Sequence, residues 1–364
     1  MSRHARPRGL LARGLLSRGL WPLAAAGLSL VLVITAIVVL SSRDEDSPVV
    51  SGPTAESAPA PSGAGGDGSR LAGQPLYVDP NGAAAEQVRA WEGAGRQADA
   101  ARIRRIADQP VATWFADDRA GYADRARQLV TAATAAGRLP VLTLYHIPDR
   151  DCSGQSAGGA ADATAYRTWV RAIATALQGH RALIVLEPDA IPQAVEGCLG
   201  ARAAQERYAL LAEAVGALRA NPGVLVYLDA GNPTWITDPS RMLAALRSSG
   251  IAKASGFSLN VANFETTADN VAYGNRLSAL LGGAHYIVDT SRNGNGPARK
   301  GAGNQHWCNP PGRALGDPPT TRTGVPLADA YLWIKRPGES DGACGNGAPP
   351  AGQWWPEYAL GLTR

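Results

Sequence analysis

The strongest constraint on the fold is a repeated alternation of short apolar, β-branched segments with longer segments that have a helical pattern. The apolar segments are nearly continuous, which is typical of strands buried on both faces of a parallel sheet that is covered by helices. We predict strands at residues 110–116, 140–147, 182–188, 224–230, 256–262, 285–290 and 330–335, and helices at 119–136, 162–178, 202–219 and 239–248.

Seven such units in one region, residues 75–364, favour a TIM-like parallel (β/α) barrel over an open sheet. Hydrophobic residues make up 45% of the chain, which is enough to form a substantial core. We therefore expect an α/β fold with a single barrel domain over 75–364.

The first 74 residues have a different composition. Residues 1–18 carry five arginines and no acidic residue, and residues 19–40 form an uncharged, mostly apolar run that is long enough to span a bilayer. We predict a transmembrane signal anchor at 19–40, with 1–18 in the cytoplasm and the bulk of the chain outside the cell. Residues 41–74, rich in Ser, Pro, Gly and Ala, are predicted to be a flexible linker. The alternative is a cleaved signal and a secreted protein.

The basic terminus accounts for the net charge of +4. Beyond residue 40 the chain has 30 basic and 31 acidic residues, so its folded part is nearly neutral and no nucleic-acid partner is expected. The sequence contains no His-Glu-x-x-His motif, no Gly-x-Ser-x-Gly motif, no Walker loop and no Cys/His spacing typical of zinc sites. We predict neither a metal nor a cofactor.

All four cysteines lie beyond the predicted linker. An even number of cysteines in an extracellular region indicates two disulfides, and four cysteines allow three pairings.

Polar side chains gather where the predicted strands end. In (β/α) barrels the active site lies at the C-terminal ends of the strands, so these side chains should meet. One strand-end aspartate is often only a helix cap, but several strands that end in carboxylates, with aromatic residues among them, indicate a functional site. The residues in question are Trp114, Asp151, Glu187, Asp189, Asp229, Asn260, Asn263, Asp289, Lys335, Glu339 and Asp341.

Carboxylates and Trp rings without a metal site suit carbohydrate chemistry. Cleavage of a glycosidic bond needs one protonated carboxyl group to donate to the leaving oxygen and a second carboxylate to activate water or attack the sugar. Neighbouring carboxylates raise one another's pKa, which keeps the acid protonated.

Six motifs over about 76–364 resemble glycoside hydrolase family 6, the β-1,4-glucanases and cellobiohydrolases, in the order found in that family. They are Tyr145–Cys152, Leu186–Asp189, Tyr227–Gly231, Asp289–Pro297, Trp307–Arg313 and Trp333–Gly342. The resemblance implies a distorted seven-stranded barrel that hydrolyses β-1,4-glucans with inversion.

The resemblance also implies roles for five residues. Asp189 matches the general acid, and Asp151 matches the carboxylate that raises the pKa of the acid and helps to organise the water. Asp341 matches the proposed base, whose identity is contested in the family and which can act through a water chain. Asp229 would support Asp189 and the sugar ring, and Tyr145 would press the ring towards a distorted shape.

Other positions match residues that bind glucosyl units, and two positions depart from the family pattern. Asn232 stands where family members often have His, followed by Trp235, and Ala157 stands where a loop serine is expected, with Ser156 beside it. The candidate substrate-binding residues are Trp114, Asn232, Trp235, Asn260, Asn263, Trp307, Lys335 and Glu339.

The positions of the cysteines relative to the strands narrow the possible pairings. Cys152 and Cys198 follow the second and third strands, whereas Cys308 and Cys344 flank the seventh. We predict the disulfides 152–198 and 308–344.

We expect a monomeric, membrane-anchored endo-β-1,4-glucanase that acts on cellulose-like glucan outside the cell. Only 20 residues separate Arg313 from Ile334, too few for the long loops that roof an exo-acting tunnel. The alternatives are an exo-acting cellobiohydrolase and a catalytically silent glucan-binding protein of the cell wall.

Overall fold

A computed structural model describes residues 71–299, 306–345 and 347–364. Its core is one sheet of seven parallel strands in sequence order, β1 to β7. The strands are β1 Thr113–Phe115, β2 Val141–Leu144, β3 Ala182–Leu186, β4 Val224–Asp229, β5 Gly256–Leu259, β6 His285–Asp289 and β7 Ala328–Leu332. Each of them overlaps a predicted strand, so the predicted parallel α/β sheet is confirmed.

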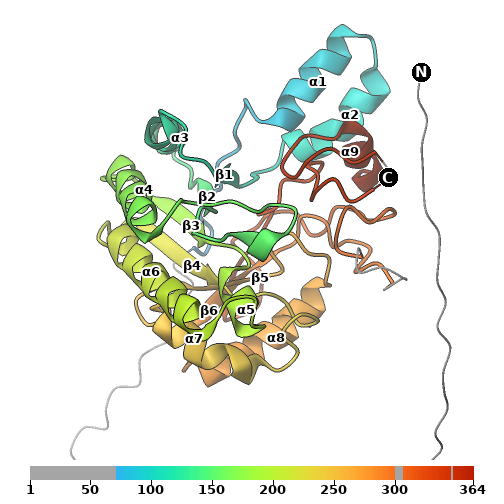
Figure 1. Ribbon diagram of the computed structural model, residues 1–364. Helices are drawn as coiled ribbons and strands as arrows, with labels where there is room; N and C mark the ends of the chain where they lie inside the picture. Colours follow the sequence, from blue (N-terminus) through green and yellow to red (C-terminus); the bar gives the residue numbers. More distant parts are fainter. Residues whose placement is uncertain (1–70, 300–305, 346) are drawn as a thin grey trace, which may run out of the picture. The chain divides into compact units, whose positions relative to one another are not determined.

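The sheet curls into a half-barrel rather than a regular closed barrel (Figure 1). The gap between its two edges is spanned by an isolated parallel bridge between Val111 and Trp333, where the Ala112 N–H donates to the Trp333 carbonyl (3.0 Å). The Trp114 indole N–H crosses the same gap to the Ile334 carbonyl (2.8 Å). These contacts bring the ends of β1 and β7 to the same part of the molecule.

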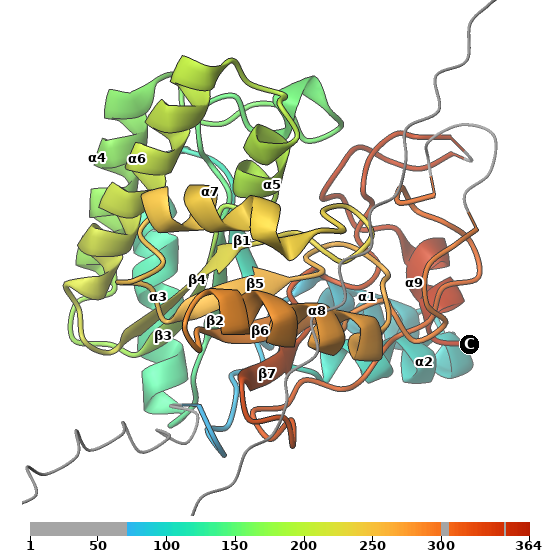
Figure 2. The same cartoon turned by 90° about the horizontal axis from the view of Figure 1, so that it is seen from below.

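Helices cover the outside of the curled sheet. The predicted helices are present as α3 Tyr122–Ala135, α4 Ala163–Ala176, α6 Ala201–Arg219 and, for 239–248, the 3-10 turn η2 Pro239–Met242 followed by α7 Leu243–Ser248. Sequence reasoning missed α1 Ala83–Gly93, α2 Gln97–Ala107, α5 Ala190–Val195, α8 Thr267–Leu280, α9 Pro356–Leu362 and the 3-10 turn η1 Asp151–Ser153. Figures 1 and 2 both show α1, α2 and α9 gathered together, and these helices share a small apolar cluster with Trp333.

Both faces of the sheet are buried because alternate side chains of each strand enter different cores. On β3, Leu183 and Val185 belong to the cluster inside the half-barrel, whereas Ile184 and Leu186 pack against the outer helices. This arrangement explains why the strands read as continuous apolar runs.

Helix α4 illustrates how the outer layer forms. The Asp162 carboxylate accepts the Ala165 N–H (2.8 Å) and caps the helix, and Tyr166, Trp169 and Ile173 recur at helical spacing and are buried. A cap followed by one apolar stripe is sufficient to place a helix against the sheet.

Part of the predicted N-terminal organisation falls on described residues. Leu71, which the prediction assigned to the linker, is fully buried in the inner cluster. Within residues 71–299, 306–345 and 347–364, no helix has the length and apolar character needed to cross a bilayer. The predicted segments 1–18 and 19–40, and all of 41–74 except its last four residues, lie outside the described residues.

Candidate active site

A cleft of about 460 Å³ lies at the C-terminal ends of the strands. This is where barrel folds place their active sites, and it is where the sequence predicted the functional side chains to meet. Ten of the predicted site residues line it, namely Trp114, Tyr145, Asp151, Asp189, Asn232, Trp235, Asn263, Trp307, Lys335 and Asp341.

Asp189 follows β3 and begins the short helix α5. Its backbone has a left-handed φ of 68°, an uncommon conformation for a residue other than Gly, which turns the chain sharply at the cleft. Burial raises the pKa of Asp189 well above its usual value, and the charges of Asp229 and Asp151 raise it further. A hydrogen bond from Tyr145 and the charge of Lys335 oppose this shift without cancelling it. Asp189 is therefore the cleft carboxyl group that best retains a proton near neutral pH.

Asp229 ends β4 and lies behind Asp189, outside the lining of the cleft. It is fully buried and accepts the Asp189 N–H (2.9 Å), the Gly231 N–H (3.3 Å) and the Ser258 hydroxyl (3.3 Å). Burial raises the pKa of Asp229 to about 6, although these hydrogen bonds lower it. Through the bond to the Asp189 N–H, Asp229 supports the turn that carries Asp189.

Asp151 lies in a strained loop after β2. Asp149, Asp151, Cys152 and Ser153 all have φ between 45° and 72°. The carboxylate oxygens of Asp151 accept the Ser156 N–H (2.6 Å) and the amide of Gln193 from α5 (3.1 Å). These donors hold Asp151 in a fixed position beside the segment that carries Asp189.

Further bonds tie the Asp151 loop to the Asp189 segment. The buried guanidinium of Arg207 donates to the carbonyls of Pro148 (3.0 Å), Asp149 (2.8 Å) and Ala190 (3.3 Å). Cys152 and Cys198 form a disulfide, which confirms the predicted pairing.

Asp341 has an environment opposite to that of Asp189. It pairs with Arg292 (2.8 Å) and Lys335 (3.3 Å), and all three side chains are largely buried. Burial by itself would raise the pKa of Asp341, but the charges of Arg292 and Lys335 outweigh it and lower the pKa below its usual value. Asp341 is therefore held in its charged form.

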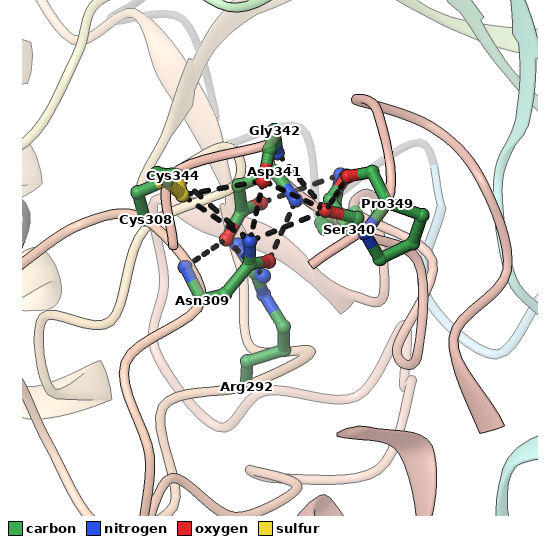
Figure 3. Close-up of a disulfide and its surroundings, with 9 residues drawn as sticks. Arg292, Cys308, Asn309, Ser340, Asp341, Gly342, Cys344 and Pro349 are labelled. Carbon is green, nitrogen blue, oxygen red and sulfur yellow. Dashed lines mark hydrogen bonds and ion pairs between the residues drawn. A yellow bond between two sulfur atoms is a disulfide. The ribbon is translucent and has the colours of Figure 1, made fainter. Parts of the chain in front are cut away.

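Asn309 fixes the backbone around Asp341 (Figure 3). The Asn309 N–H donates to the Asp341 carboxylate (3.0 Å), and the Asp341 N–H donates to the Asn309 side-chain oxygen (2.7 Å). The Asn309 amide also donates to the Ser340 hydroxyl (3.2 Å) and the Gly342 carbonyl (2.9 Å). The disulfide between Cys308 and Cys344 closes the same loops, and this confirms the second predicted pairing.

Aromatic side chains border the carboxylates. Tyr145 packs edge-on against Trp114, with ring centroids 5.4 Å apart, and the Arg150 guanidinium lies 4.8 Å from the Tyr145 ring centroid. Burial and the nearby charges of Asp189 and Asp151 raise the pKa of Tyr145, so its hydroxyl stays protonated. Trp307 is 40% exposed and offers an open aromatic face in the cleft.

Asn232, one of the two departures from the family pattern, supports a turn. Its side-chain oxygen accepts the N–H groups of Thr234 (3.1 Å) and Trp235 (3.0 Å), so it fixes the turn that presents Trp235 to the cleft. The second departure from the family pattern is Ala157, which stands where a loop serine is expected. Ala157 does not line the cleft, but the neighbouring Ser156 does. The Ser156 carbonyl accepts the Arg150 guanidinium (2.7 Å).

Two predicted binding residues lie outside the lining of the cleft. Asn260 is fully buried and braces the loop after β5, since its amide donates to the carbonyls of Glu265 (3.1 Å) and Asp289 (2.8 Å). Glu339 is buried, pairs with Arg336 (2.8 Å) and lines a separate pocket of about 200 Å³.

Sequence reasoning missed several residues that line the cleft. Most of them lie on helix α5 or in irregular loops, where no periodic pattern marks them. Position relative to a strand end could not have identified them, with the partial exception of Phe264 and Glu265, which directly follow Asn263. They are Gln155, Gln193, Thr234, Phe264, Glu265, Pro297 and His306. In the part of the chain that the structure describes, no group of His, Cys, Asp and Glu side chains is arranged to hold a metal ion.

Comparisons with known proteins point to the same family that the sequence motifs resemble. The family model described as glycosyl hydrolases family 6 matches residues 71–364. Endoglucanase 1 of Streptomyces halstedii is 42% identical over 292 residues, which covers 78% of this chain and 87% of that protein. Endoglucanase A of Cellulomonas fimi is 41% identical over 292 residues, covering 79% of this chain and 61% of that protein, so the chain spans about three-fifths of the length of this relative.

Solved structures agree with these matches. The endoglucanase Cel6 from Mycobacterium tuberculosis, solved with methyl-cellobiosyl-4-deoxy-4-thio-β-D-cellobioside, is 45% identical with a TM-score of 0.75. The match covers 80% of this chain and 97% of that one. The catalytic core of the cellobiohydrolase Cel6A from Chaetomium thermophilum is 27% identical with a TM-score of 0.70, covering 82% of this chain and 98% of that one.

Proposed function

Because this chain belongs to glycosyl hydrolase family 6, we propose that it hydrolyses β-1,4-glucosidic bonds in cellulose-like glucans. The observation that carries the proposal is the pair of contrasting carboxyl groups in one cleft. Burial and like charges raise the pKa of Asp189, whereas two cations lower the pKa of Asp341. Groups whose pKa values are pushed apart in this way suit the acid and base tasks of glycoside cleavage.

In this mechanism Asp189 donates its proton to the glycosidic oxygen as the bond to the leaving sugar breaks. Tyr145 constrains the sugar ring, and Trp114, Trp235 and Trp307 pack against sugar faces. Asp151, which is held in place by the Ser156 N–H and the Gln193 amide, helps to orient the attacking water. Water attacks from the face opposite the leaving group, so the product has inverted configuration.

Asp341 is the proposed base. Its ion pairs with Arg292 and Lys335 stabilise the charged form and therefore weaken it as a proton acceptor. We expect Asp341→Asn to reduce the rate less than Asp189→Ala does, and we expect azide, which needs no base, to restore part of the rate. Failure of azide to restore the rate of Asp341→Asn would refute this assignment.

We propose endo action because the three relatives named above that are more than 40% identical are called endoglucanases, and because Arg313 and Ile334 are separated by only a short segment. An endo enzyme lowers the viscosity of a soluble glucan after few cleavages. A cellobiohydrolase would instead release cellobiose with little loss of viscosity.

The deciding experiment is a product time-course on soluble β-glucan, read by chain length and by NMR of the fresh anomer. Inverting hydrolysis gives the α-anomer first. Predominantly β product would mean retention and would refute the roles proposed for Asp189 and its partners. Absence of any reducing sugar, with glucan binding retained, would support a silent binding protein instead.

We also propose that residues 19–40 anchor the protein in the membrane, with its active site outside the cell, because this run is uncharged, apolar and preceded by five arginines. Activity should then sediment with membranes and be released by proteolysis within 41–74. Finding all of the protein in the medium, with an N-terminus beyond Leu40, would favour a cleaved signal.

A further inference from the structure

Glu265 is a carboxylate in the cleft that the mechanism does not use. It lies in the loop between β5 and α8, lines the cleft and is only 8% exposed. Its surroundings differ from those of the carboxyl groups discussed above, and they indicate a separate task.

The backbone of Glu265 is clamped by buried amides. Its carbonyl accepts the side chains of Asn260 (3.1 Å), Asn270 (3.0 Å) and Asn293 (3.0 Å), and its N–H donates to the Asn260 oxygen (3.1 Å). These bonds involve only the peptide, so the fold would accept many side chains at this position. The carboxylate is therefore not explained by the structure of the loop.

The carboxylate itself has few partners. One oxygen accepts the Thr234 hydroxyl (2.8 Å), and no ion pair to Glu265 is found among residues 71–299, 306–345 and 347–364. Asp341, in contrast, has two cations. A largely buried carboxylate with a single hydroxyl partner costs stability unless a further donor reaches it.

Thr234 connects Glu265 to an aromatic platform. Thr234 and Trp235 are successive residues of the turn that Asn232 fixes. These three residues line the cleft together with Glu265. A sugar that stacks on Trp235 would bring its hydroxyl groups, which are hydrogen-bond donors, near the Glu265 carboxylate. A charged acceptor beside an aromatic face is a suitable arrangement for one glucosyl unit.

We propose that Glu265 is a specificity-determining residue that binds a hydroxyl of the sugar stacked on Trp235 and favours uncharged glucan chains over chains with anionic substituents. This inference rests on the proposed function. A carboxylate on the substrate at this position would meet an unneutralised negative charge, whereas a hydroxyl would donate to it.

The test compares Glu265→Gln with Glu213→Gln, a control with the same charge change at an exposed position on α6. Gln keeps an acceptor for Thr234 but removes the charge. For Glu265→Gln we expect KM for cellohexaose to rise about three- to tenfold, since a charged hydrogen bond is lost. The ratio of kcat/KM on carboxymethyl cellulose to kcat/KM on cellohexaose should rise about fivefold. The control should change neither quantity.

A purely structural role would give different results. If Glu265 only holds the Trp235 turn through Thr234, then Glu265→Gln leaves both quantities unchanged, while Thr234→Val impairs cellohexaose and carboxymethyl cellulose alike. That pattern would overturn the inference.

The inference and the proposed function can fail separately. Calorimetric titration of cellohexaose into Asp189→Asn and into Asp189→Asn/Glu265→Gln measures binding without turnover. A wild-type protein that cleaves no glucan would refute the proposed function. Equal affinities of the two Asp189→Asn proteins would refute the role of Glu265, and weaker binding by the double variant would support it.

Discussion

The cleft has two sides, and each places a carboxyl group in a different electrostatic environment. After β3 and β4, Asp189 has acidic neighbours, and its pKa is raised by burial, Asp229 and Asp151. After β6 and β7, Asp341 is buried but has Arg292 and Lys335 beside it, and its pKa is lowered. Burial acts in the same direction on both groups, so the sign of the difference comes from the charged partners.

The largest expected effect concerns Asp189, on the side of the cleft where its neighbours are acidic. Asp189→Ala should lower kcat/KM on cello-oligosaccharides about 10³-fold, because no proton reaches the leaving sugar. An aryl cellobioside with an activated leaving group needs little protonation and should lose much less. Steady-state kinetics on both substrates measures the difference, and an equal loss on both would contradict the general-acid role.

The next effect concerns Asp341, on the side of the cleft where its neighbours are Arg292 and Lys335. Arg292→Met would leave the buried Asp341 with one cation, Lys335, and should destabilise the fold by about 3–4 kcal/mol at neutral pH. The low pKa of Asp341 contributes stability above the unfolded value near 3.9, and this contribution is lost as pH falls through the folded value. The difference from wild type in urea unfolding should therefore shrink below about pH 4. A constant difference from pH 3 to pH 7 would show that lost packing, not charge, is the cause.

The third prediction concerns the two disulfides, one on each side of the cleft. Each closes a loop, with sequence separations of 46 and 36, so removing either one by paired Cys→Ser changes should cost roughly 2–4 kcal/mol. Loss of the 152–198 disulfide should change the pH–rate profile through the Asp151 loop. Loss of the 308–344 disulfide should change it through Asp341 and Trp307. Denaturation curves with pH–rate profiles check this prediction. Identical changes in the two profiles would mean that the bridges do not act on separate sides.

The smallest expected effect concerns the charge of Asp229 beside Asp189. Asp229→Asn removes a like charge beside Asp189 while keeping an oxygen to accept the Asp189 N–H. The pKa of Asp189 should fall, and the basic limb of the kcat/KM profile should move about one unit to lower pH. Asp329→Asn is a suitable control, because Asp329 is also buried but bonds Tyr227 and His285 outside the lining of the cleft. An unmoved limb in Asp229→Asn would contradict the role of its charge.

The strands were predictable because being buried on both faces leaves a continuous apolar pattern. The missed helix α8 lacks such a signal, since it buries Asn270, Gly274 and Ser278 along with its apolar residues. Helices α1, α2 and α9 are short and pack mainly against one another and against Trp333, which directly follows β7. Their position depends on contacts between the two ends of the described chain.

The sequence by itself determined the parallel sheet, the two disulfide pairings and most of the carboxylates that meet in the cleft, because each is tied to the end of a strand. The tertiary structure decided the electrostatic environment of each carboxylate. Arg292 and Lys335 reach Asp341 from different segments, Gln193 reaches Asp151 from a helix, and Glu265 reaches the cleft from a loop. A pKa depends on burial and on neighbours brought together by folding, and neither is recorded in the local pattern of residues.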